Sequence, residues 1–305
     1  MIKQIMRWSL FFAMSFSFQL NAELKKNFSY QERIQLLNMA TFGINAELLQ
    51  DLIAMSSENA SSKEIGWLDS QLDSPSAYDD SDDDWKTHLQ RVVDLTIFSM
   101  PTVDFYNSSA NWDKFKIFNR TEADWIMQHY QMSAWLDNSL GNVNLSPKIG
   151  SDQLRQRTAY AFSQLLVISK STSPLHRRSE GLAHYYDILA KNALGNYETL
   201  LQEVLRSPAM GVFLSSAFNK KASLANSTRP DENLAREFLQ LFTIGPYELN
   251  LDGSVKMDEK GEIIPSYSQN DIMEMAKILT GWILYASDPW NVAGEKIGSY
   301  VHLMK

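Results

Sequence analysis

The chain lacks several features that would assign it to a class directly. Its 305 residues include no cysteine, which excludes disulfide bonds, thiol nucleophiles and thiolate metal sites. Its formal charge of −8 gives it no basic excess, whereas a nucleic-acid-binding protein needs a basic surface. It also has no Gly-x-Ser-x-Gly motif and no glycine-rich phosphate loop. We therefore expect no nucleic-acid partner, and acyl-transfer and nucleotide chemistry have no signature here.

Long hydrophobic runs are also missing. The longest apolar stretch, from Trp8 to Phe18, is shorter than the roughly 20 residues that a membrane-spanning helix needs. Lys3 and Arg7 precede this stretch, and Ala22 offers a small residue at which a signal peptidase could cut. The pattern predicts a signal peptide over residues 1–22, export to the periplasm or the outside of the cell, and no stable membrane span after cleavage.

Apolar residues recur at helical spacing almost throughout the chain from Tyr30 onward. At 44% hydrophobic and 21% charged residues, the composition is that of a globular protein with a core. Turn signals typical of β structure occur only near residues 247–267, where Asp252-Gly253 and Lys260-Gly261 can each form a tight turn. We predict an all-α fold, a multi-helix globular array with one short β-hairpin excursion at 247–267.

An acidic run divides the sequence. Five aspartates crowd into residues 79–84, where their mutual repulsion favours a solvated loop. We expect an N-terminal helical subdomain over residues 23–75, an acidic loop over 76–84 and a main helical domain over 85–305.

Several helix boundaries carry recognisable signals. Asn196 is placed to cap a helix over 197–205, and Ser268 to open another that continues through 272–284. Pro230 suits the first turn of a helix that runs to about Thr243, with Gly245 as its terminator. Thr121 begins a sequence that resembles a capping box.

The densest polar cluster lies over residues 229–237. A solvated polar face is one interpretation, and a buried ion-pair network is another. Arg155 sits at the end of the apolar stripe of a predicted helix over 152–169 and needs a partner, for which we nominate Asp231, Glu232 and Glu237. A carboxylate pair whose pKa values are separated by its surroundings can also act as acid and base. The candidate catalytic residues are Arg155, Asp231, Glu232, Asn233, Arg236 and Glu237, with Arg229 beside them.

Residues 248–259 follow the spacing of a calcium-binding loop. Oxygen ligands would come from Glu248, Asn250, Asp252 and Glu259, with Gly253 at the turn position. Lys256 departs from the template, because it puts a positive charge where a ligand is expected. A β-hairpin with an Asp-Gly turn is the alternative, and calcium is the only cofactor that the sequence suggests.

Long blocks of the sequence resemble a known bacterial family. These blocks are DQLRQRTAYAFSQLLVIS (152–169), AHYYDILAKNALGNYETLLQEVLRSPAMGVFLSSAFNKK (183–221), RPDENLAREFLQLFTIGPYELNLDG (229–253) and ILTGW (278–282). Together they place the family core at 152–282 and resemble the bacterial domain of unknown function 1800. The resemblance implies an exported, largely helical protein without an assigned reaction, often encoded beside an exported sulfatase-like protein. Relatives usually continue beyond the last block, so we expect this chain to be C-terminally truncated.

The resulting functional hypothesis is an exported accessory protein of the cell envelope that binds a protein partner, an exported sulfatase-like protein being the candidate that the resemblance suggests. One alternative is a hydrolase-like enzyme that uses the carboxylates of Asp231, Glu232 and Glu237 together with Arg155 and Arg236. A second alternative is a calcium-binding structural protein. Whether the protein is an enzyme, and its oligomeric state, are left open by the sequence.

Overall fold

The computed structural model describes residues 30–43, 71–72, 87–99, 120–140, 152–172, 175–284, 291–292, 295–296 and 304. The predicted signal peptide and the predicted acidic loop lie outside these residues. Within the described residues, no helix is both long enough and apolar enough to cross a membrane.

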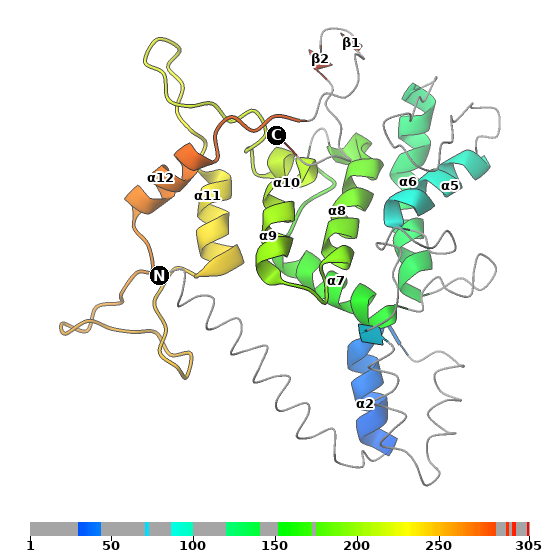
Figure 1. Ribbon diagram of the computed structural model, residues 1–305, viewed down its shortest axis with the longest axis horizontal. Helices are drawn as coiled ribbons and strands as arrows, with labels where there is room; N and C mark the ends of the chain where they lie inside the picture. The colour runs from blue at the N-terminus through cyan, green and yellow to red at the C-terminus, as the bar shows by residue number, and fades with distance from the viewer. Residues whose placement is uncertain are drawn as a thin grey trace.

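The described part of the chain is mostly helical (Figure 1), so the predicted all-α class is confirmed. Its α-helices are α2 (Tyr30–Ala40), α5 (His88–Ser99), α6 (Arg120–Leu140), α7 (Gln153–Leu165), α8 (Ser179–Lys191), α9 (Tyr197–Leu205), α10 (Pro208–Phe213), α11 (Asn233–Glu237) and α12 (Gln269–Ile278). A 3-10 turn, η2 (Leu175–Arg177), and a π-helix, η3 (Phe238–Thr243), complete the helical elements. Two-residue strands β1 (Asn291–Val292) and β2 (Glu295–Lys296) pair antiparallel.

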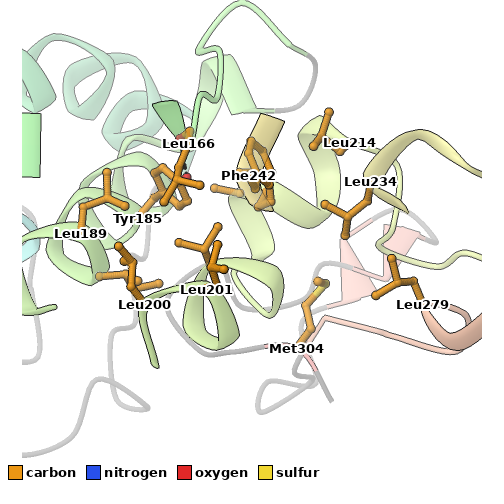
Figure 2. Close-up of a cluster of buried hydrophobic side chains, with 14 of the residues drawn as sticks. Leu166, Tyr185, Leu189, Leu200, Leu201, Leu214, Leu234, Phe242, Leu279 and Met304 are labelled. Carbon is orange, nitrogen blue, oxygen red and sulfur yellow. Dashed lines mark hydrogen bonds between the residues drawn. The ribbon is translucent and has the colours of Figure 1, made fainter. Parts of the chain in front are cut away.

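Helix α8 forms the centre of the array. It contacts α5, α6, α7, α9 and α10, and most of its residues are buried because helices cover it on several sides. The main hydrophobic core lies between α8, α9, α10, α11 and α12 (Figure 2). Side chains from distant parts of the chain meet there, including Leu166, Leu189, Phe242 and Met304. Each fully buried leucine of this size contributes about 1.5–3 kcal/mol relative to an exposed one.

The predicted N-terminal subdomain is described only at residues 30–43 and 71–72. Helix α2 contacts α7, and Phe42 just after it packs edge-on against Trp135 of α6 at 5.3 Å between ring centroids. Arg157 of α7 lies over the Phe42 ring, a cation–π contact at 5.4 Å. These contacts attach α2 to the main helical array.

The local boundary signals were read correctly in two places. The Asn196 side chain accepts hydrogen bonds from the backbone N–H groups of Glu198 and Thr199, and α9 begins as predicted. Ser268 forms a reciprocal capping box with Asp271, although α12 ends at Ile278, earlier than the predicted 284. Three other boundaries were wrong: α6 begins at Arg120, before Thr121, α7 ends at Leu165 rather than at 169, and α11 begins at Asn233, so that Pro230 lies before its first turn.

Helix α11 passes without a break into the π-helix η3, which ends at Thr243 as predicted. The wider π turn brings the Thr243 hydroxyl to the carbonyl of Phe238, to which it donates at 2.7 Å. Gly245 ends the helix with φ of 74°, a left-handed conformation that favours glycine, and its N–H donates to the Leu239 carbonyl.

Residues 244–268 form an arm that extends away from the helices between η3 and α12 (Figure 1). Isolated antiparallel bridges join Leu249 to Val255 and Met257 to Ile263, so the arm contains two hairpins in succession. Their turns contain Gly253 and Gly261, both at positive φ, as the Asp-Gly and Lys-Gly signals predicted. The predicted β excursion at 247–267 is therefore present, as two hairpins rather than one.

Candidate functional site

The polar cluster at the start of α11 is a clamp between two helices. The guanidinium of Arg236 donates to Glu232 Oε2 at 3.1 Å and to the Gln269 side-chain oxygen at 3.3 Å. The Gln269 amide closes the triangle by donating to Glu232 Oε2 at 2.8 Å. Because Gln269 is the first residue of α12, the triangle fixes α12 against α11 at the point where the chain returns from the arm. Gln269 was missed by the sequence analysis, since nothing local connects it to a residue 37 positions earlier.

Asp231 and Asn233 take part in a second, mainly backbone arrangement. The Asp231 carboxylate accepts from the Asn233 N–H at 2.8 Å, which satisfies one of the free N–H groups at the start of α11. The side-chain amide of the buried Asn219 makes two hydrogen bonds to the Asp231 backbone. Its Oδ1 accepts from the Asp231 N–H at 2.8 Å, and its Nδ2 donates to the Asp231 carbonyl at 3.2 Å. The Asn219 carbonyl also accepts from the N–H of Gly281, so this residue ties together three segments.

The other members of the predicted cluster are not joined to this arrangement. Glu237 is half-buried and Arg229 is exposed, and within the described residues no hydrogen bond or ion pair of either side chain is found. The structure therefore brings Glu232 and Arg236 together and leaves the Glu237 carboxylate apart from them. Catalysis by these residues stays a prediction.

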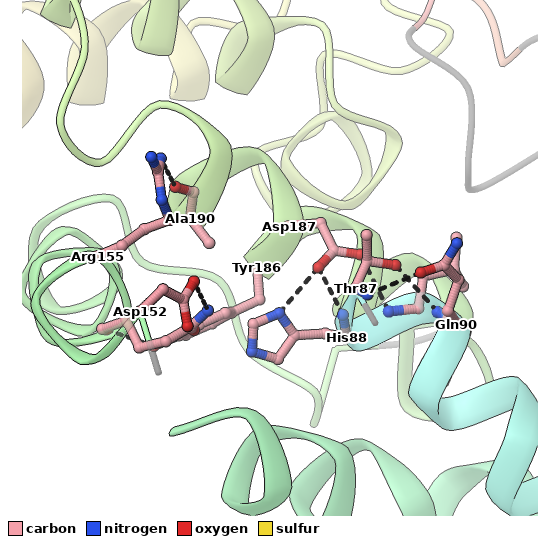
Figure 3. A network of polar contacts seen from close by, with 10 residues as sticks. Thr87, His88, Gln90, Asp152, Arg155, Tyr186, Asp187 and Ala190 are labelled. Carbon is pink, nitrogen blue, oxygen red and sulfur yellow. Dashed lines mark hydrogen bonds and ion pairs between the residues drawn. The ribbon is translucent and has the colours of Figure 1, made fainter. Parts of the chain in front are cut away.

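The partner predicted for Arg155 was wrong. Its guanidinium donates to the carbonyl oxygens of Ala190 and Lys191, both at 3.1 Å, at the C-terminal end of α8 (Figure 3). No hydrogen bond or ion pair joins it to the three nominated carboxylates in the part of the chain that is described. The last carbonyls of a helix lack intrahelical partners and carry partial negative charge, so a cation is favoured there. Arg155 is a helix cap.

A buried polar cluster around α8 was not anticipated (Figure 3). Asp187 of α8 accepts from the backbone N–H groups of His88 and Leu89 at 2.7 and 3.0 Å, and lies 2.8 Å from His88 Nδ1. It thus caps the start of α5 from 99 residues away in the sequence. The Thr87–Gln90 capping box at the same helix end was a local signal that could have located this boundary.

Asp152 is the second buried carboxyl group of this region. Burial raises its pKa above the ordinary value of 3.8, although the hydrogen bond that Gln156 Nε2 donates at 3.1 Å and the nearby charge of Arg155 lower it. The ring of Tyr186 stands edge-on to that of His88, with centroids 4.6 Å apart. Burial raises the pKa of Tyr186 as well. These groups lie among packed helices.

The four predicted calcium ligands are spread over the two hairpins of the arm. Glu248 is paired with Lys256, whose Nζ lies 3.0 Å from Glu248 Oε2, and Asp252 Oδ1 accepts from the N–H and hydroxyl of Ser254. Asn250 donates to the Ser254 hydroxyl in the same turn, whereas Glu259 lies in the second turn. In the part of the chain that the structure describes, no three His, Cys, Asp or Glu side chains are grouped as a metal site would require. The calcium loop that the sequence resembles is therefore left to experiment.

Exposed large apolar side chains also gather on the arm. Tyr247, Leu249, Val255, Met257 and Ile263 expose between 36% and 62% of their surface, and Leu251 at the first turn exposes 85%. Scattered exposed apolar residues are normal, whereas a gathering of them on one projecting element is typical of interaction surfaces.

The structure thus defines a helical protein built around α8 with a projecting β arm. A family model described as Protein of unknown function (DUF1800) matches residues 35–300, so the chain belongs to this family, as the resemblance over 152–282 indicated. No curated protein and no solved structure matches the chain.

Proposed function

We propose that the protein is an accessory protein of the cell envelope that acts by binding a protein partner. The observation that carries this proposal is the arm, on which six large apolar side chains are at least one-third exposed although the chain buries similar residues elsewhere in its core. Removing such surface from water favours association, by about 25 cal/mol per Å² of apolar area before the entropic costs of association are subtracted.

The polar clusters support this reading more than they support catalysis. Glu232 and Arg236 are hydrogen-bonded to each other and to Gln269, and Arg155 to helix carbonyls, so the contacts of these groups join helices to one another. A general acid or base must instead reach a substrate proton within hydrogen-bond distance.

The proposal that the protein is exported is based on the signal-peptide pattern of residues 1–22. Fractionation of the native cells tests it, because an exported protein is recovered outside the cytoplasm and has lost these residues.

Partner binding is tested by affinity purification of the tagged, full chain from the native envelope. We expect enrichment of a protein in stoichiometric amount, and an exported sulfatase-like protein is the first candidate to look for. Recovery of the chain alone under several mild detergents and salt concentrations would contradict the proposal.

A further inference from the structure

We propose that one face of the arm is the docking face, and that it binds a protein whose own apolar patch is bordered by lysine and arginine residues. This inference rests on the proposed function and adds the site and the chemistry of the partner.

The arm is a three-way junction of β ribbons. The N–H of Lys256 donates to the Glu248 carbonyl, that of Ile264 to the Lys256 carbonyl, and that of Glu248 to the Ile264 carbonyl, at 2.9, 3.1 and 3.0 Å. Each of these three residues thus pairs with both of the others. Two ribbons end in the hairpin turns, and the third leads back to the helices through the bridge between Tyr247 and Pro265.

An eight-residue sequence period underlies this junction. Gly245, Gly253 and Gly261 recur at intervals of eight and all have positive φ, between 74° and 84°. In each unit the glycine is followed two residues later by Tyr247, Val255 or Ile263. Each strand therefore starts from an equivalent backbone position and reaches the junction in the same register.

This register places the apolar side chains on one face. Successive side chains of a strand point to opposite faces, and directly paired residues share a face. Since residues 248, 256 and 264 meet at the centre, the residues on either side of each of them belong to the other face. These residues form the apolar face, and they are Tyr247, Leu249, Val255, Met257, Ile263 and Pro265.

The opposite face of the arm is mainly polar. Glu248 and Lys256 form an ion pair there, and Asn250 donates to the hydroxyl of Ser254 in the same ribbon. A ribbon with one polar and one apolar face is expected to have its apolar face covered by another surface. Here that face is exposed to solvent.

The net charge of the arm distinguishes between a lipid surface, a second copy of the chain and another protein as the binding partner of the apolar face. The arm carries the five carboxylates of Glu248, Asp252, Asp258, Glu259 and Glu262, but only Lys256 and Lys260, for a net charge of −3. An anionic lipid surface would repel this arm, and a second copy would bring two like-charged arms together. Glu248, Asp258 and Glu262 lie on the opposite face of this narrow element, so the attraction comes from the net charge of the arm as a whole. A protein patch bordered by basic residues is drawn to that charge and contributes the apolar surface that the face lacks.

The test is photo-crosslinking of the full chain in the native cells, with a benzophenone amino acid at Met257 on the apolar face. The matched control carries it at Glu262, an exposed residue of the same ribbon on the opposite face. Circular dichroism melting of both variants checks that the fold is kept. We expect a protein adduct with the crosslinker at position 257 and no adduct with the crosslinker at position 262. The crosslinked peptide of the partner should be apolar and flanked by Lys or Arg.

Other crosslinking results would contradict either the docking face, the chemistry of the partner, or the proposed function. Capture of a partner by the tagged chain with no adduct at 257, or with equal adducts at both positions, would refute the docking face and leave the proposed function standing. An adduct with a second copy, with lipid, or with an acidic partner segment would refute the partner chemistry. Absence of any captured or crosslinked protein would refute both proposals.

Discussion

The side chain of Met304 fills the space beside Gly211, so that a Cβ atom at position 211 would lie 2.5 Å from both Sδ and Cε of the methionine. Met304 is fully buried, and its N–H donates to the carbonyl of Arg206 at 2.7 Å. A residue near the end of the chain is thus part of the core formed by α8–α12.

Gly211→Ala is therefore expected to destabilise the protein by about 1 kcal/mol, because the new methyl group must displace the flexible end of the buried Met304 side chain while the better helix propensity of alanine in α10 offsets part of that cost. Urea unfolding measures it. Gly195→Ala is the matched control, because the nearest atom to a Cβ there is 3.5 Å away, and it should change stability by no more than about 0.5 kcal/mol. In a Met304→Ala background the effect of Gly211→Ala should shrink. If Gly211→Ala destabilises the Met304→Ala protein as much as it does the wild type, the methyl group of Ala does not clash with Met304.

Asp187→Ala is expected to cost roughly 3 kcal/mol or more, because it leaves the buried N–H groups of His88 and Leu89 without an acceptor. The comparison is Asn196→Ala, which removes an exposed cap and should cost only about 1 kcal/mol. Chemical denaturation of both variants provides the measurement. Equal losses would show that Asp187 is no more than an ordinary cap.

Asp152 and Asp271 should affect the pH dependence of stability with opposite signs. Burial raises the pKa of Asp152 in the folded state, so its ionisation favours unfolding as pH rises from its ordinary value of 3.8 through the raised one. Asp152→Asn should therefore gain stability relative to the wild type across that window. Hydrogen bonds from the N–H and hydroxyl of Ser268 lower the pKa of Asp271, so its contribution is present above 3.8 and is lost as pH falls.

Asp271→Asn should accordingly be less stable than the wild type above pH 3.8, with the difference vanishing in acid. Unfolding free energies of both variants and the wild type at a series of pH values test this. Parallel curves for the two variants would be incompatible with the buried position of Asp152.

Calcium is expected to leave the thermal midpoint of the wild-type protein unchanged up to roughly millimolar concentration. Lys256 donates to the Glu248 carboxylate, and the Ser254 hydroxyl donates to that of Asp252, so calcium binding would have to break both contacts. Calorimetry with and without calcium decides the question. A rise in midpoint that Asp252→Asn abolishes would establish the calcium loop that the sequence resembles.

The sequence located those features that depend on a few neighbouring residues. Asn196 and Ser268 cap helices through N–H groups two or three positions away, and the Asp-Gly and Lys-Gly pairs set the turns of the arm. Such contacts follow from local backbone geometry, which short patterns encode.

Features that depend on tertiary packing were missed or misassigned. Arg155 was given distant carboxylates as partners, yet the end of α8 passes closer and offers free carbonyls. The pairing of Asp187 with His88 joins residues 99 positions apart and has no signal in a single sequence. The interval of eight between Gly245, Gly253 and Gly261 is visible in the sequence, but so short a period does not by itself predict that three strands meet at one junction.

The most direct test of the central claim is the affinity of the captured partner for the purified chain carrying Leu249→Ser and Met257→Ser, compared with Glu262→Ser. Loss of two apolar side chains from the docking face should weaken binding about tenfold or more, whereas the change on the opposite face should leave it within about twofold. The wild type, the double variant and the Glu262→Ser variant should have the same helical content. Equal affinities for the wild type and the double variant would show that the partner binds elsewhere and that the arm is not the functional surface.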